Sequence, residues 1–136
     1  MATDPVYGPA LGFLETSSIA SGIEATDAMM KKAQVELLLT LIVPRGKYLI
    51  LVGGQVADVE QSLAAGREKA GKTVLDEFLI QGVHPQLPAA IRGRVVPPKL
   101  EAVGIIETKE VASAIFAGDA AVKAAAVTLV EARNQA

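Results

Sequence analysis

Two glutamates, Glu15 and Glu107, have the clearest potential for chemistry, because each lies in a repeated Glu-Thr phrase. Paired carboxylates can serve as general acid and general base. These two lie in separate copies of the repeat, and neither has a histidine or a metal-binding cluster near it in sequence. We therefore expect both to make structural hydrogen bonds, expect the repeated Asp27 and Asp119 to make helix or interface contacts, and predict no catalytic residue.

Cysteine is absent from the chain, and His84 is its one histidine. The absence of cysteine excludes disulfides, thiol catalysis and cysteine-ligated zinc or iron–sulfur centres within these residues. A single histidine also excludes most other metal sites. A histidine beside Pro85 is typical of a turn. We predict no metal site and no cofactor, and the chain is not expected to be an enzyme.

Binding to nucleotides, nucleic acids or membranes is also disfavoured. Gly53-Gly54 follows an apolar run as a phosphate-binding turn would, but it lacks the Lys-Ser/Thr of a P-loop. The net charge of −2 comes from mixed acidic and basic residues, so no basic tract favours nucleic acid or an anionic membrane. The longest apolar run, Val35 to Val43, is too short to span a bilayer. We expect no nucleic-acid and no membrane partner.

The elements that carry these residues belong to a duplicated unit. The stretch from Ala10 to Leu38 returns without a gap as Ala102 to Val130, and roughly half of the paired positions are identical. A spacing of about ninety residues is too long for a solenoid and indicates a tandem of small domains. With 51% hydrophobic but only 4% aromatic residues, the core must pack small aliphatic side chains.

The first copy reads as β-α-β-β-α-β. Apolar runs, helical periodicity and turn residues predict strands and helices in the following order: strand 10–16, helix 19–33, strand 35–43, a turn at 44–47, strand 48–52, helix 56–70 and strand 74–83. This order predicts an α+β (α/β) ferredoxin-like fold built on an antiparallel sheet.

The second copy supplies the first half of this pattern. We expect a flexible leader at residues 1–9, a complete domain at 10–91 with a short helix at 87–91, a linker at 92–101 and a partial β-α-β domain at 102–136. Its predicted elements are a strand at 102–108, a helix at 111–125 and a strand at 127–131. Such a half-sheet leaves apolar surface and a strand edge unpaired, so the chain alone is expected to associate or precipitate.

The phrase ALGFLETSSIASGIEATDAMMKKAQVELL resembles the opening of a bacterial microcompartment shell-protein domain. The resemblance continues through VGGQVADVEQSLAAGREKAG to the strand before VHPQL and covers all that is present of the second copy. The tandem order is similar to that of the trimeric shell proteins of the propanediol-utilisation type. That resemblance implies a homotrimer, or pseudohexamer, whose flat hexagonal tile joins other shell proteins in a microcompartment shell within the bacterial cytoplasm.

The resemblance also implies roles for particular residues. Lys31 and Lys123 match the family's edge lysine in its DAMxKxA motif, and His84-Pro85 lies where the family has a turn near the tile edge. The family's central pore is lined by the turn between the second and third strands, which here comprises Val43, Pro44, Arg45, Gly46 and Lys47. Some tandem members hold an iron–sulfur cluster through a cysteine in this turn. The absence of cysteine here argues against a cluster.

Two questions stay open from the sequence. The missing half of the second domain could come from a separate polypeptide, from exchange between subunits, or from a longer protein of which this chain is a fragment. We favour a separate polypeptide. A shell tile with a metabolite pore is the function that we expect. The alternative is a ferredoxin-like trimeric regulatory protein that binds a small molecule between subunits.

Overall fold

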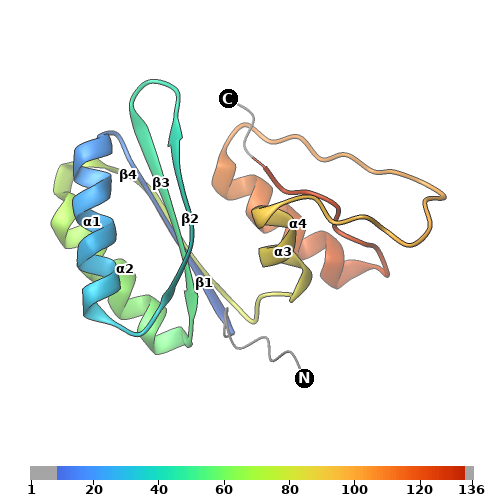
Figure 1. Cartoon of the computed structure of the whole chain (residues 1–136), viewed down its shortest axis with the longest axis horizontal. Helices are drawn as coiled ribbons and strands as arrows, with labels where there is room; N and C mark the ends of the chain where they lie inside the picture. Colours follow the sequence, from blue (N-terminus) through green and yellow to red (C-terminus); the bar gives the residue numbers. More distant parts are fainter. Residues whose placement is uncertain (1–8, 134–136) are drawn as a thin grey trace. The chain divides into compact units, whose positions relative to one another are not determined.

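The computed structural model describes residues 9–133, which form two compact units, residues 9–82 and residues 83–133. The first unit contains the predicted order of elements, labelled in Figure 1. Its bounds are β1 (Ala10–Thr16), α1 (Ile19–Lys32), β2 (Glu36–Val43), β3 (Lys47–Gly54), α2 (Val56–Ala70), a 3-10 turn η1 (Gly71–Thr73) and β4 (Val74–Gln81). The predicted α+β class and the ferredoxin-like order are confirmed.

The four strands form one antiparallel sheet in the order β2-β3-β1-β4. Strand β1 therefore has a neighbour on each side, although both neighbours come later in the chain. Phe13 of β1 lies opposite Leu51 of β3 and Phe78 of β4, and the two phenylalanine rings stack with centroids 4.8 Å apart. Every residue of β1 is buried. The central strand depends on pairing with segments more than thirty residues away along the chain.

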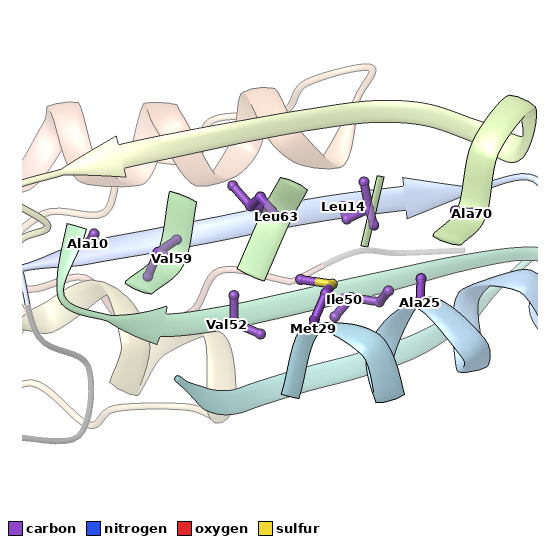
Figure 2. Close-up of a cluster of buried hydrophobic side chains, with 9 residues drawn as sticks. All are labelled: Ala10, Leu14, Ala25, Met29, Ile50, Val52, Val59, Leu63 and Ala70. Atoms are coloured by element: carbon purple, nitrogen blue, oxygen red, sulfur yellow. The ribbon is translucent and has the colours of Figure 1, made fainter. Parts of the chain in front are cut away.

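Helices α1 and α2 cover one face of this sheet (Figure 1). Figure 2 shows side chains from both helices converging on those of β1 and β3, with Met29, Leu63, Leu14 and Ile50 near the centre of the cluster. Each fully buried side chain of this size stabilises the folded state by about 1.5–3 kcal/mol relative to an exposed one. The cluster between the sheet and the helices is aliphatic, as the composition predicted.

Close helix–sheet contact depends on small residues. A Cβ atom built at Gly12 of β1 would lie 2.6 Å from Cγ1 of Val59 on α2. The matching residue of the second copy, Gly104, has no atom within 4 Å of such a Cβ. Glycine at position 12 is therefore required by the packing of α2, and the second copy retains this glycine without a helix against it.

The second unit is built on two helices, α3 (Gln86–Arg92) and α4 (Val111–Ala124). The structure differs here from the predicted strands, because neither Ala102–Thr108 nor Val127–Glu131 belongs to a strand among the described residues. The sheet order explains the difference. The second copy contains counterparts of β1 and β2 only, and in the first unit these two strands are separated by β3. Without a β3 counterpart, residues 102–108 and 127–131 have no adjacent strand to pair with.

The division between the two units falls at Val83, so α3 belongs with α4. This places residues 83–91 with the second unit, whereas the sequence pattern ended the first domain at residue 91. Of the predicted leader 1–9, residues 1–8 lie outside the described residues, and the Pro9 carbonyl accepts a hydrogen bond from the backbone N–H of Gly82. The boundaries 1–9, 10–91, 92–101 and 102–136 remain a proposal for the evolutionary domains.

We predict that Gly12→Val destabilises the chain by about 1–3 kcal/mol, because the new side chain overlaps buried Val59. The matched control is Gly104→Val, for which the open surroundings predict a change within about 0.5 kcal/mol. Urea denaturation followed by circular dichroism measures both. Equal effects of the two substitutions would contradict the close approach of α2 to β1.

Candidate functional site

The turn between β2 and β3 is the predicted pore-lining segment. Val43 pairs with Lys47 at the end of the ladder, so Pro44, Arg45 and Gly46 form the loop, and all three are exposed. Arg45 and Gly46 both take positive φ, 70° and 74°. A positive φ was expected only at Gly46, because a left-handed conformation costs an arginine roughly 1–2 kcal/mol. Successive positive φ values are typical of tight hairpins that follow the twist of their strands.

The two cations of this turn differ in their surroundings. Nζ of Lys47 lies 3.4 Å from Oε1 of Glu15, whose side chain is almost fully buried at the end of β1. The positive charge of Lys47 is therefore largely matched by a carboxylate. Arg45 has no ion-pair partner among residues 9–133. The contact is an ion pair, whereas the sequence led us to expect a structural hydrogen bond for Glu15.

The first predicted edge residue, Lys31, lies in the last turn of α1. Its Nζ is 2.8 Å from Oδ2 of Asp27, and both side chains are largely exposed. An exposed pair four residues apart on a helix contributes roughly 0.3–0.5 kcal/mol. The pair thus adds little stability.

In the second unit, Lys123 makes the same contact with Asp119, but in different surroundings. Here the aspartate side chain is only 9% exposed, and its Oδ1 accepts a hydrogen bond of 2.9 Å from the backbone N–H of His84. Nδ1 of His84 in turn accepts from the backbone N–H of Gln86, at the start of α3. Asp119 therefore fixes the turn that leads into α3 while Lys123 balances its charge.

Three of the predicted edge residues thus lie together: Lys123, His84 and Pro85, which precedes α3 directly. Lys31 lies in the other unit. The sequence did not identify Asp119 as the buried acceptor at the centre of this cluster. The sequence does show an Asp and a Lys four residues apart in both copies. Whether the aspartate becomes a buried hydrogen-bond acceptor depends on the elements packed against it, which the repeat alone does not reveal.

Residues 9–133 contain no group of three or more His, Cys, Asp or Glu side chains placed to hold a metal ion. Across the same range, no helix is both long enough and apolar enough to cross a membrane. The features that stand out are a charged turn and hydrogen-bonded helix contacts.

We predict that Asp119→Ala destabilises the second unit by about 1–3 kcal/mol, because it leaves the His84 N–H without its acceptor. Hydrogen exchange measured by mass spectrometry should show faster exchange across residues 83–93. The matched control is Asp27→Ala, which removes an exposed partner only and should leave exchange in both units unchanged. Unchanged exchange at 83–93 in the Asp119 variant would contradict this role.

Comparison with known proteins gives consistent matches. The BMC domain family model matches residues 10–83 and 102–136. The bacterial microcompartment shell protein PduT of Citrobacter freundii is 46% identical over 121 residues, covering 89% of this chain and 66% of that protein. The chain thus spans just under two thirds of the length of PduT. The major carboxysome shell protein of Halothiobacillus neapolitanus is 35% identical over 85 residues, which cover 60% of this chain and 87% of that protein.

A solved structure supports the same family assignment. The crystal structure of a microcompartments protein from Desulfitobacterium hafniense DCB superposes with a TM-score of 0.78 at 43% identity, covering 90% of this chain and 68% of that one. The resemblance noted in the sequence is thereby confirmed, including its similarity to a tandem shell protein of the PduT type. With two family matches that together span most of its residues, the chain belongs to the BMC-domain family.

Proposed function

We propose that this chain is a structural component of a bacterial microcompartment shell, located in that shell within the cytoplasm, and that it is not an enzyme. The observation that carries the proposal is the double BMC-domain match, supported by the 46% identity to a microcompartment shell protein. The contacts among the described residues are compatible with a structural role. The Lys47–Glu15 ion pair lies at the β2–β3 hairpin, and the hydrogen bond from the His84 N–H to Asp119 holds the turn before α3.

In this proposal three chains form a pseudohexagonal tile, because each chain contributes two related units to a ring of six. When one surface of a unit binds a different surface of the next, a ring forms if the rotation between successive units closes. The tile then joins other shell proteins through its edges. Lys31 and Lys123, together with His84-Pro85, are the proposed edge residues.

The proposal requires that the second unit be completed. Residues 102–106 expose apolar side chains, including Ile105, which is 89% exposed. Such a surface favours association with a partner that covers it. We propose that the partner supplies counterparts of β3, α2 and β4, either as a separate polypeptide or as a continuation of the same protein.

Affinity purification of the tagged chain from the bacterium that makes it tests the function directly. Intact mass spectrometry identifies what supplies the second half, a separate polypeptide of roughly fifty to seventy residues if it is a small split domain. Electron microscopy of the same material should show hexagonally packed layers. Purified assemblies without any such layer would contradict a role in a shell, while saturable binding of a nucleotide in calorimetry would favour the regulatory alternative.

We predict that Lys31→Ala removes or disorders these layers while leaving the size of the single oligomer unchanged, because the proposed contact of Lys31 lies between tiles. The matched control is Lys32→Ala, the neighbouring exposed lysine of α1, which should retain the layers. Sedimentation velocity reports oligomer size, and electron micrographs report packing. Layers of normal order in the Lys31 variant would overturn its edge role.

We also propose that Val43, Pro44, Arg45, Gly46 and Lys47 line the pore and that Arg45 carries most of its positive charge, since Lys47 is paired with Glu15. Three copies of Arg45 around a narrow opening would favour anionic metabolites. We predict that Arg45→Glu lowers the rate at which anions enter intact shells, measured with an encapsulated reporter enzyme. Lys32→Glu is the control for a charge reversal away from the turn, and equal anion entry in the Arg45 and Lys32 variants would count against the proposal.

A further inference from the structure

The second unit contains an uncovered copy of a surface that is buried in the first unit. Corresponding positions of the two copies differ by 92, so Ile105 and Ile106 correspond to Phe13 and Leu14. The two isoleucines are 89% and 63% exposed, whereas their counterparts are 1% and 0% exposed. In the first unit the neighbours of this surface are β3, α2 and β4. The first unit is therefore a template for the segment that covers the second.

Two contacts of α1 in this template depend on side-chain size, and the first is at Gly22. A Cβ atom there would lie 2.4 Å from Cδ1 and 2.7 Å from Cβ of Tyr48 on β3. Rotation of the tyrosine ring cannot relieve the second overlap, because the strand backbone fixes its Cβ atom. Gly22 is thus a recess in α1 that receives Tyr48. The counterpart of Gly22 on α4 is Ala114, so this recess is filled in the second copy.

The second contact has the opposite sense. Met29 is fully buried and extends from α1 into the cluster drawn in Figure 2. A Cβ atom at Gly66 of α2 would lie 2.6 Å from both Cγ and Sδ of Met29, and 3.0 Å from Cδ2 of Leu14. Met29 is thus a projection that only a glycine can receive. Its counterpart on α4 is Ala121, which has neither a Cγ nor an Sδ atom.

Other contacts of the same surface are kept in the second copy. Gly12 makes room for Cγ1 of Val59, and its counterpart is again a glycine, Gly104. Ala25, which is fully buried on α1, corresponds to another alanine, Ala117. The second copy therefore changes two size-dependent contacts in opposite directions, by filling the recess and removing the projection.

We propose that the segment which completes the second unit has a side chain smaller than tyrosine at the position of Tyr48 and one larger than glycine at the position of Gly66. The smaller side chain leaves room for the methyl group of Ala114, and the larger one fills the space beside Ala121. The inference rests on the proposed function, in which a partner supplies counterparts of β3, α2 and β4. A second copy of this chain would bring an overlap and a void, so its own segment is the poorer match.

Double-mutant cycles in the full chain test these size requirements. Two substitutions, Gly22→Ala and Met29→Ala, give α1 the side chains that α4 has. Urea denaturation followed by circular dichroism then measures the effect of Tyr48→Ala with and without Gly22→Ala, and of Gly66→Ala with and without Met29→Ala. Each second substitution should be at least about fivefold more favourable for the unfolding equilibrium in the changed helix than in the wild type. The cycle cancels the helix propensity of alanine, which acts in both backgrounds.

The crossed pairs are the matched controls. Tyr48→Ala combined with Met29→Ala, and Gly66→Ala combined with Gly22→Ala, join positions that are not the partners in either contact. Their effects should be additive to within about twofold. Additive behaviour of the two proposed pairs, Gly22 with Tyr48 and Met29 with Gly66, would overturn the proposal.

A second experiment completes the second unit directly. The chain is extended after residue 135 by a copy of its Pro44–Gly82 segment, either unchanged or with Tyr48→Ala and Gly66→Ala in the copy alone. Without urea both extensions should protect residues 102–108 from hydrogen exchange. In urea the changed copy should keep that protection to a higher concentration, because it stabilises the second unit by about tenfold or more.

The control places the same two substitutions in the first unit's own segment, where Gly22 and Met29 are retained. There they should lower the urea concentration at which Ala10–Thr16 loses protection. An unchanged copy that performs as well as the changed one would overturn the proposal, and so would exchange at 102–108 that neither extension slows.

The sequence of the natural completing segment gives an independent result, read by peptide mass spectrometry of the co-purified material. An aromatic residue at the position of Tyr48 together with glycine at the position of Gly66 would contradict the proposal. These results are separable from the shell function. Hexagonal layers without the predicted coupling contradict only the size requirements, whereas coupling without layers contradicts only the shell role.

Discussion

The position of β1 between β3 and β4 is the constraint on which the rest of the structure depends. A central strand needs two partners to satisfy its backbone donors and acceptors, and in this fold both partners follow it in the chain. The first copy contains them, and Ala10–Thr16 is buried along its whole length. The second copy keeps the strand-forming sequence but contains neither partner, and residues 102–107 are exposed. Similar sequence patterns therefore lead to different structures, because a strand needs partners that lie far away along the chain.

Helix α1 and its repeat α4 bury different faces. In the first unit, α1 packs its inner face on the sheet, whereas in the second unit the opposite face of α4 is covered by the turn at His84 and by helix α3. The chain thus shows each of the two contacts once. Small residues and aliphatic side chains suit this dual role, because flat surfaces of modest size can pack closely on either side.

Much of the first unit could be predicted from the sequence, because the apolar periodicity and turn residues of each segment favour the same elements that strand pairing and helix packing stabilise. The helix 56–70 and the strand 10–16 have the predicted bounds, and the other elements of that unit differ only at their ends. The left-handed backbone of Arg45 could not be predicted, since arginine has no preference for it and the hairpin twist imposes it. Burial of Asp119 likewise depends on α3, which lies about thirty residues before it. The predicted strand 102–108 does not form because strand formation is not a local property.

The central claim is that residues 102–133 are half of a BMC domain and fold as the first unit does once counterparts of β3, α2 and β4 are present. The most direct measurement is amide hydrogen exchange across Ala102–Thr108 in a chain extended after residue 135 by a copy of its own Pro44–Gly82 segment. That segment supplies counterparts of β3, α2 and β4, and Gly104 retains the space that α2 requires. The account predicts that Ala102–Thr108 become as protected as Ala10–Thr16. Exchange as fast as in the unextended chain would contradict it.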